Sequence, residues 1–158
     1  MEGMIQEATA IHEAHPEYLE RSLKQKILET DDNPFDSEYF TNIEHSDARD
    51  EPLREDSPCI VIATSGMLEG GPVLEYFRNF APNPKNKILF VSYQVNGTLG
   101  RRVMDGARQV TIMGREGKVE VVTINAGTEK LEGFSGHSDY NQLMSYVQRL
   151  RPKLRRVL

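Results

Sequence analysis

The stretch CIVIATSGMLEGGPVLEYF, residues 59–77, places an apolar run, a glycine-rich turn and a helical pattern in direct succession. A continuous apolar run such as residues 59–64 is typical of a strand that is covered on both faces of a parallel sheet. Residues 65–71 form the turn, and Pro72 suits the first turn of a helix over residues 72–80. This order of elements predicts an α/β layer.

The same order of elements occurs again further along the chain. Residues 87–93 indicate a second buried strand, residues 96–100 a second glycine turn, and residues 101–106 a short helix. Two such units predict the fold class, a Rossmann-like three-layer α/β domain with a mostly parallel sheet. Further strands are expected over residues 109–113, 118–125 and 131–134, with a tight turn at residues 114–117.

The segments on either side of these units differ from them in character. Helical spacing extends over residues 6–29, where Pro16 indicates two helices or a kink. Residues 30–58 are acidic and rich in Asp, Asn, Ser and Pro, which predicts an irregular connection. A last helix, capped by Ser138 or Asp139, is expected to carry Leu143, Met144, Val147 and Leu150 and to end at Pro152, before the start of a strand at residues 155–158.

Composition narrows the class of protein. With 158 residues and 38% hydrophobic content, the chain is long and apolar enough for one folded domain. It has no apolar run of about 18 residues, so neither a membrane span nor a membrane partner is expected. Cys59 is the single cysteine, which excludes an internal disulfide and a cysteine zinc site. A lone thiol in an apolar run fits a cytoplasmic location and predicts a buried structural cysteine.

Charge is distributed unevenly along the chain. Residues 1–58 hold 16 Asp and Glu against 5 Lys and Arg, whereas residues 59–158 hold 8 against 14. A basic half within a protein of net charge -5 is compatible with a polyanionic partner. Charge alone still favours a solvated surface without a partner.

The glycine turns are the first candidates for a binding site. Each follows a strand and precedes a helix, where open α/β sheets bind anions through backbone N–H groups. Neither has the spacing of a Walker or dinucleotide motif, so glycines needed only for positive φ are the favoured explanation. Arg101 and Arg102 are suited to bidentate contact with an anion, or they lie exposed at a helix start. Tyr93 is expected in the core, or stacked on a base.

The stretch GFSGHSDY, residues 133–140, places a lone histidine among small residues before the last helix. Its hydroxyls and amides are suited to hold a phosphate while His137 supplies a proton or a hydrogen bond. A capping or core histidine is the alternative. His12 and His15 share a helix face without a third ligand, so no metal site is expected there.

Several stretches together resemble the β-CASP domain of the metallo-β-lactamase-fold nucleases. They are ATSGMLEGGPVLEYF at residues 63–77, FVSYQVNGTLGRRV at 90–103 and GFSGHSDYNQLMSYV at 133–147. Residues 4–19, MIQEATAIHEAHPEYL, also resemble the first helix of that domain, so the resemblance covers nearly the whole chain. It is strongest to archaeal homologues of the cleavage and polyadenylation specificity factor endonuclease.

The resemblance implies the chemistry of a zinc-dependent ribonuclease. Nucleases of this family hydrolyse RNA phosphodiesters with two zinc ions held by the metallo-β-lactamase domain, and the β-CASP domain covers the cleft. His137 matches the motif B histidine, which implies a hydrogen bond to the scissile phosphate or protonation of the leaving oxygen. The implied partner is single-stranded RNA, which would be contacted by Ser65, Gly66, Tyr93, Arg101, Arg102, Ser135, Gly136 and Ser138.

The chain also departs from the family pattern. The zinc-ligand motif His-x-His-x-Asp-His is absent, so the chain resembles an excised β-CASP domain over residues 1–132 and a motif B segment over residues 133–158. We expect it to bind no zinc and to hydrolyse nothing by itself, whereas the parent protein would carry two zinc ions. A homodimer is expected of the parent and a monomer of this chain, because relatives dimerise through segments that follow this region.

The implied role is to clamp RNA during 3′-end processing, transcription termination or decay. A stand-alone nucleotide- or RNA-binding module without catalysis is the first alternative, and a natural gene that ends near Leu158 would favour it. A DNA-directed nuclease of the same superfamily is the second. A 2′-deoxy substitution at the cleavage position separates it from a ribonuclease.

Overall fold

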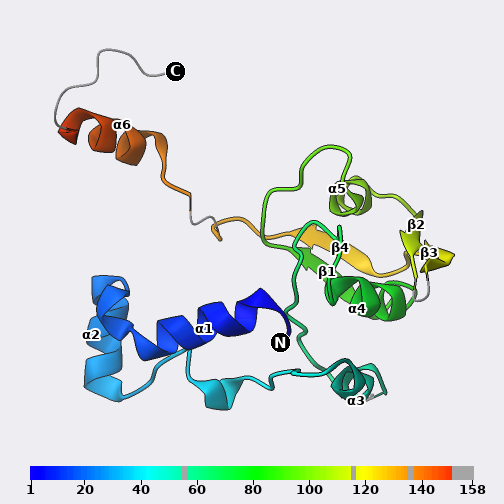
Figure 1. Cartoon of the computed structure of the whole chain (residues 1–158), viewed down its shortest axis with the longest axis horizontal. Coiled ribbons are helices and arrows are strands. Elements are labelled where there is room, and N and C mark those ends of the chain that lie inside the picture. Colours follow the sequence, from blue (N-terminus) through cyan, green and yellow to red (C-terminus); the bar gives the residue numbers. More distant parts are fainter. Residues whose placement is uncertain (55–56, 115–116, 135–136, 151–158) are drawn as a thin grey trace.

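The computed structural model describes residues 1–54, 57–114, 117–134 and 137–150 (Figure 1). Within these residues, helices dominate both ends of the chain, and the strands lie between residues 87 and 130. The N-terminal elements are α1 (Met4–Ala14), η1 (Pro16–Tyr18), α2 (Arg21–Thr30), η2 (Ser37–Tyr39), η3 (Ser46–Arg49) and α3 (Asp50–Arg54). The following elements are α4 (Val73–Phe80), β1 (Lys87–Phe90), α5 (Leu99–Met104), β2 (Gln109–Met113), β3 (Val119–Thr123), β4 (Gly127–Lys130) and α6 (Tyr140–Arg149).

The α/β class is confirmed, with the described strands arranged in two pairs. β1 and β4 are parallel, with Lys87 opposite Gly127 and Phe90 opposite Lys130. β2 and β3 are antiparallel, as expected of a hairpin. The strand predicted at residues 131–134 is wrong: the pairing strand is β4, just before it, and only the Leu131 N–H continues the ladder by donating to Phe90 O. β4 has no apolar alternation, so its pattern gave no strand signal.

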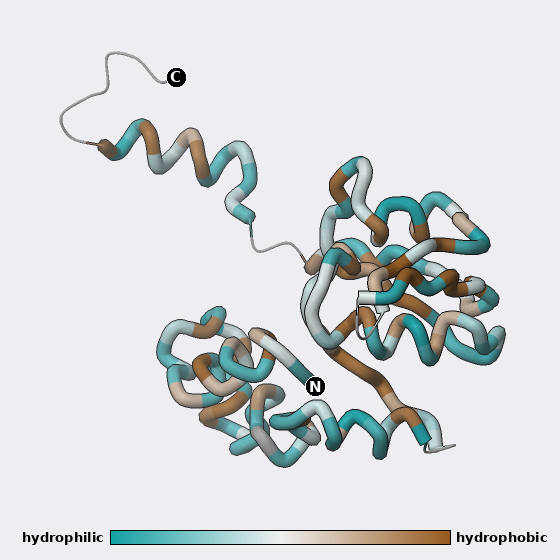
Figure 2. The backbone as a smooth tube through the Cα atoms, turned by 45° about the vertical axis from the view of Figure 1, so that its right-hand side comes forward, coloured by the Kyte–Doolittle hydropathy of each residue, from teal (hydrophilic) through white to brown (hydrophobic). Residues whose placement is uncertain are grey.

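The apolar run at residues 59–64 does not form the predicted strand. Its single bridge joins Ala63 to Glu2 in parallel, and Glu2 N donates to Ile62 O at 2.9 Å. The rest of the run is extended but lacks a ladder, so Ile60 is 88% exposed. Figure 2 shows this run as a hydrophobic segment that leads toward the α/β part from below. Cys59 is exposed, so the prediction of a buried thiol is also wrong.

The hydrophobic core lies where α4 and α5 meet the strands. α4 contributes Phe77, and the chain leaves α4 through Ala81, which is completely buried. Ala81 O accepts hydrogen bonds from the N–H groups of Asn125 and Ala126, which fixes the end of α4 against the segment between β3 and β4. The buried cluster consists of Leu68, Phe77, Ala81, Phe90, Leu99, Val103, Val110, Ile112, Val122 and Ile124.

The predicted break at Pro16 is confirmed, because Pro16 begins the short η1 between α1 and α2. The side chain of Glu20 accepts hydrogen bonds from Ser22 N and Leu23 N and thereby caps α2. α2 ends at Asp31, which adopts a left-handed conformation at φ 55°. Local hydrogen bonding therefore accounts for both ends of α2.

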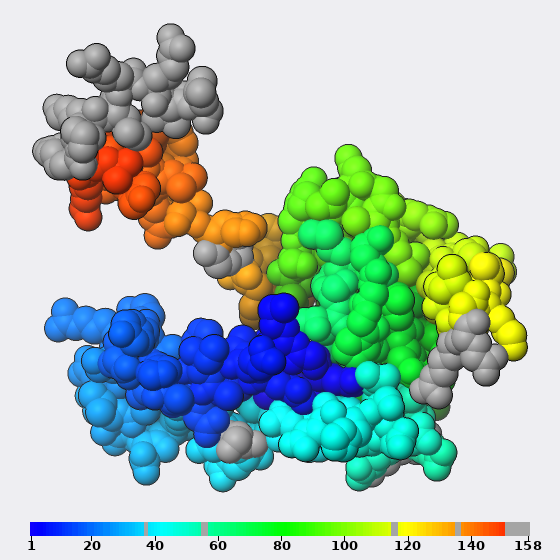
Figure 3. Space-filling model, in the orientation of Figure 1, coloured from blue at the N-terminus to red at the C-terminus, as the bar shows by residue number. Residues whose placement is uncertain are grey.

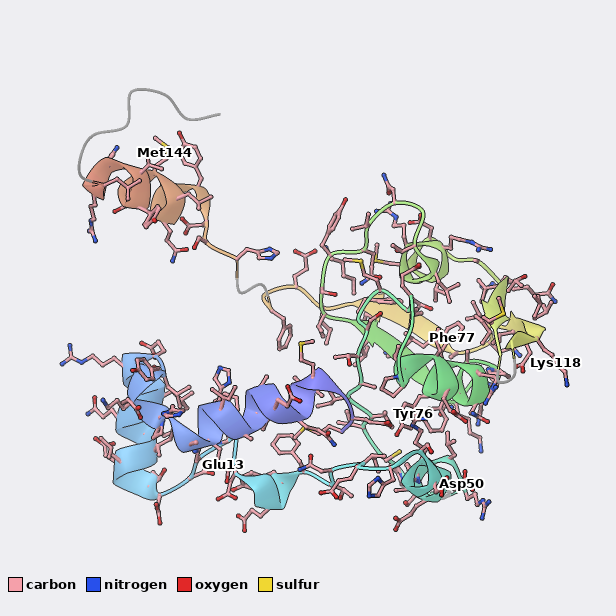
Figure 4. All side chains as sticks on the ribbon, viewed as in Figure 1. Glu13, Asp50, Tyr76, Phe77, Lys118 and Met144 are labelled. Atoms are coloured by element: carbon pink, nitrogen blue, oxygen red, sulfur yellow. The ribbon has the colours of Figure 1, made fainter. Side chains whose placement is uncertain are left out.

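A polar network attaches the acidic connection to the α/β part. Arg49, from η3, donates through Nε to both carboxylate oxygens of Glu2, at 2.8 and 2.9 Å. Tyr76 on α4 donates its hydroxyl to the same carboxylate at 2.8 Å. In Figure 4, Tyr76 lies on the side of α4 that faces the N-terminal segments, whereas Phe77 belongs to the core. Apart from its three short helices, η2, η3 and α3, the described part of residues 30–58 is irregular, as predicted.

The last helix, α6, projects away from the rest of the chain (Figure 3). Asp139 is its N-cap: its side chain accepts from Gln142 N, and the Gln142 side chain accepts from Asp139 N, which completes a capping box. This selects Asp139 over Ser138 as the cap. Residues 151–158, where the end of the helix at Pro152 and a final strand were predicted, lie outside the described residues. None of the described helices is long and apolar enough to cross a membrane.

Candidate nucleic-acid interface

Several predicted site residues lie on loops that leave one edge of the β1–β4 sheet. Because β1 and β4 are parallel, the segments that follow Phe90 and Lys130 start at the same edge. The turn at residues 65–71, called here the first turn, is held at this edge because Gln94 Nε2 donates to Gly66 O at 2.9 Å. The carboxyl edge of parallel strands is the usual ligand-binding edge of α/β proteins.

The first turn is held by its own hydrogen bonds. Ser65 N donates to Gly70 O, and the Ser65 hydroxyl accepts from Glu69 N at 3.2 Å. Gly71 has φ +76°, and a Cβ there would lie 2.9 Å from Thr64 O. Gly71 therefore meets a backbone requirement, which agrees with the structural explanation for this glycine. Gly66, within the same turn, is exposed.

The segment at residues 91–98, called here the second turn, presents an aromatic ring to solvent. Tyr93 is 65% exposed, so it is not a core residue. Arg101 follows in α5 and pairs with Asp105, with Nε 2.8 Å from Oδ2. Asp105 mainly, and Tyr93 to a smaller degree, raise the pKa of Arg101, which remains cationic. Arg102 is exposed. An exposed ring beside cationic side chains is suited to a base and its phosphate.

The backbone amides at the start of α5 are already occupied. Leu99 N donates to Glu69 Oε1 at 2.6 Å, and Gly100 N donates to Met67 O at 2.9 Å. Arg101 N donates to the Thr98 hydroxyl, the N-cap of the helix. An anion would find these N–H groups engaged, so the arginine side chains, and not the turn amides, are the available anion ligands here.

His137 lies on the segment between β4 and α6, and its side chain is exposed. Ser138 is exposed beside it, immediately before the cap residue Asp139. Ser135 and Gly136, the other predicted phosphate contacts, lie outside the described residues. The structure thus places Ser65, Gly66 and Tyr93 on adjacent turns, and His137 on a separate loop that starts from the same sheet edge.

Within the described ranges, no group of three or more His, Cys, Asp and Glu side chains is arranged to hold a metal ion. These residues therefore do not form a zinc site by themselves.

Sequence reasoning missed Gln94 and Glu69, the side chains that connect the two turns. Gln94 is 1% exposed, and Glu69 reaches from the first turn to the start of α5. A polar residue directly after the strand predicted over residues 87–93 was the available signal for Gln94. The contact made by Glu69 spans 30 residues of sequence, and no local pattern encodes it.

Comparison with known families gives two matches that follow one another along the chain. The Beta-Casp domain matches residues 1–103. The Zn-dependent metallo-hydrolase RNA specificity domain matches residues 121–158.

Comparison with curated proteins gives relatives named transcription termination factor FttA. The one from Cenarchaeum symbiosum is 78% identical over 157 residues, which cover 99% of this chain and 24% of that protein. The one from Pyrococcus abyssi is 49% identical over all of this chain and 24% of its own length. The one from Methanocaldococcus jannaschii is 48% identical, over all of this chain and 25% of its own length. The chain thus spans about a quarter of the length of these relatives.

Proposed function

Because this chain belongs to the Beta-Casp family, we propose that it forms the RNA-holding part of a zinc-dependent ribonuclease. The RNA specificity domain matched by residues 121–158 and the relatives named as transcription termination factors support this proposal. The processes that it would serve are transcription termination and the formation of RNA 3′ ends.

The observation that carries the proposal is the grouping of loops at the carboxyl edge of β1 and β4. There the exposed ring of Tyr93 lies on the turn that leads into α5, which carries Arg101 and Arg102. A stacking surface next to cations is the usual arrangement for unpaired nucleotides, because bases stack on the ring while phosphates pair with guanidinium groups. We assign base contact to Tyr93 and phosphate contact to the arginines.

His137 is the residue of this chain to which we assign contact with the reacting phosphate. Its exposed imidazole is able to donate a hydrogen bond to a phosphoryl oxygen, or a proton to the leaving oxygen. Since the described residues do not form a zinc site, the zinc ligands would belong to another part of the longer protein.

The proposal is tested in the full-length protein by comparing the wild type with His137→Ala. Cleavage of a labelled single-stranded RNA is expected to fall about a hundredfold or more, the usual loss for a general acid or base. Zinc content, measured by mass spectrometry, is expected to stay unchanged. His45→Ala is the matched control, because His45 is also exposed and lies in the acidic connection, away from the loops.

Unchanged cleavage in His137→Ala would remove this residue from the chemistry. Equal loss in both variants would point to a general effect on the fold. A wild type that cleaves single-stranded DNA as fast as RNA would contradict an RNA-specific enzyme.

A further inference from the structure

Three hydrogen bonds connect the first turn with the second turn and the start of α5, and the first turn accepts all three. From the second turn, Gln94 Nε2 donates to Gly66 O at 2.9 Å. From the first turn, Glu69 Oε1 accepts from Leu99 N at 2.6 Å. A backbone bond between Gly100 N and Met67 O, at 2.9 Å, lies between them. We refer to these contacts as the cross-turn hydrogen bonds.

The buried Gln94 side chain restricts the movement of the two turns relative to each other. It is 1% exposed, and its Nε2 also donates to Ser92 O at 3.2 Å. Its Oε1 has no hydrogen-bond partner among the described residues and lies against Gly100. A Cβ at Gly100 would overlap this oxygen and lie 2.9 Å from Met67 O, so only glycine fits between the turns.

A buried amide without its full set of partners costs stability, and proteins rarely retain one without a reason. We propose that Gln94 and Glu69 are positioning residues, which join the two turns into one rigid unit and thereby place Tyr93, Arg101 and Arg102 for RNA. This inference rests on the proposed function, because it assigns a purpose to those three side chains. Tyr93 directly precedes Gln94, and the arginines directly follow the amides that the first turn holds.

The rigid unit also explains how an RNA site can lie beside an acidic side chain. The Glu69 carboxylate accepts from Leu99 N at the start of α5, so this N–H group is already engaged. With Leu99 N engaged by Glu69, the groups left to bind RNA phosphates are the guanidinium groups of Arg101 and Arg102. A preorganised arrangement of that kind raises affinity because fewer groups must be ordered on binding.

A matched pair of variants separates positioning from charge. Glu69→Ala and Glu69→Gln both remove the same negative charge, but only Gln keeps an acceptor for Leu99 N. Because Glu69 is exposed, neither change disturbs the core. Gln94→Met removes the amide and keeps the length of the side chain. Gly70→Ala is the control within the first turn, since a Cβ there meets no atom within 4 Å.

All variants are made in the full-length protein, in the His137→Ala background that slows cleavage. Hydrogen exchange is measured at the amides of Leu99 and Gly100, and binding of a labelled single-stranded RNA is measured by anisotropy over a series of salt concentrations. We expect faster exchange and about three- to tenfold weaker binding in Glu69→Ala than in Glu69→Gln, the effect of one lost hydrogen bond between uncharged groups. Gln94→Met should behave like Glu69→Ala, and Gly70→Ala like the background protein.

The salt series gives the result that a loss of stability alone would not produce. If the arginines are misplaced and a phosphate contact is lost, the slope of log K against log salt becomes smaller by about the amount that one phosphate contact contributes. Partial unfolding lowers the active fraction but leaves that slope unchanged.

The possible results separate this inference from the proposed function. Equal exchange in Glu69→Ala and Glu69→Gln would overturn the rigid unit. Faster exchange with unchanged affinity and slope would overturn the positioning role. Absence of RNA binding in the background protein and in the wild type would overturn the proposed function, while the exchange data would still decide whether the turns are joined.

Discussion

The region between residues 68 and 126 and the helices that flank it use their apolar side chains differently. The buried cluster lies entirely within residues 68–124, and α4 and α5 contribute to it. By contrast, α2 and α6 bury none of their residues, and Leu28 and Tyr146 are 77% and 65% exposed. All four segments are nonetheless helical.

The difference shows that the interactions that start a helix are not those that decide how much stability it adds. α2 and α6 begin at side-chain caps, Glu20 and Asp139, and none of their residues is fully buried. α4 has no side-chain cap, yet it buries Tyr76 and Phe77. Burial of apolar side chains stabilises a fold more than a cap does, so the free energy of unfolding should depend far more on α4 than on α2.

The largest expected effect is that of Phe77→Ala. Phe77 is 5% exposed within the core, so its truncation leaves a cavity and should lower the free energy of unfolding by about 3–5 kcal/mol. Urea unfolding combined with hydrogen exchange in α4, β2 and β3 measures the loss. Leu28→Ala on α2 is the control and should stay within about 0.5 kcal/mol of the wild type. Comparable losses in both variants would show that the two regions do not differ as described.

A smaller effect is expected where the flanking segments are attached to the core. Arg49→Met keeps the apolar stem but leaves the Glu2 carboxylate, only 7% exposed, with Tyr76 as its remaining side-chain donor. Breaking a pair that is largely buried should cost about 2–3 kcal/mol. Faster hydrogen exchange is expected in residues 1–14 and 43–54, and little change in β2 and β3.

Arg54→Met is the matched control for Arg49→Met. Arg54 pairs with Asp50 in the exposed i,i+4 geometry, at 2.7 Å, and such pairs contribute about 0.3–0.5 kcal/mol. If Arg49→Met were as mild as Arg54→Met, the polar network would not hold the acidic connection in place.

The difference between local and long-range interactions also explains how much of the fold the sequence could predict. Periodicity together with local caps predicts α4, β2 and α6 well, because those signals lie within the elements themselves. Pairing between distant segments is not a local signal. In the apolar run at residues 59–64, only Ala63 pairs with another segment, so the run is not part of a ladder. The polar β4, by contrast, pairs with β1, which lies 40 residues earlier in the sequence.

The candidate site shows a similar limit. The family resemblance, and not local composition, selected Tyr93, Arg101 and Arg102 as RNA contacts, and the residues alone favoured a core position for Tyr93, which is 65% exposed. Neither was enough to find that Glu69 and Met67 occupy the amides at the start of α5, since those contacts cross from one turn to the other. The RNA-contact roles assigned to Tyr93, Arg101 and Arg102 stay predictions, as do those assigned to Ser65, Gly66 and His137.

The smallest expected effects are on the pH dependence of stability. They arise in the polar network, from Glu2 at acid pH and from Tyr76 at alkaline pH. Burial raises the pKa of Glu2, but hydrogen bonds from Arg49 and Tyr76 outweigh it, so the folded pKa lies below the ordinary 4.5. Burial first, and then the bond to Glu2, raise the pKa of Tyr76 above its ordinary 10.0. A depressed carboxylate pKa stabilises the fold above pH 4.5, and this contribution is lost as pH falls through the folded value. A raised phenol pKa stabilises the fold fully below pH 10.0, and this contribution is lost as pH rises toward the folded value.

Substitution of each partner should therefore change a different side of a plot of unfolding free energy against pH. Glu2→Gln should flatten the acid side, because the group whose pKa is depressed is gone, and Tyr76→Phe should flatten the alkaline side. Urea unfolding over a series of pH values measures both. Tyr146→Phe, at a tyrosine that is 65% exposed, should leave both sides as they are. An alkaline side that is unchanged in Tyr76→Phe would mean that burial and the bond to Glu2 do not raise the pKa of Tyr76.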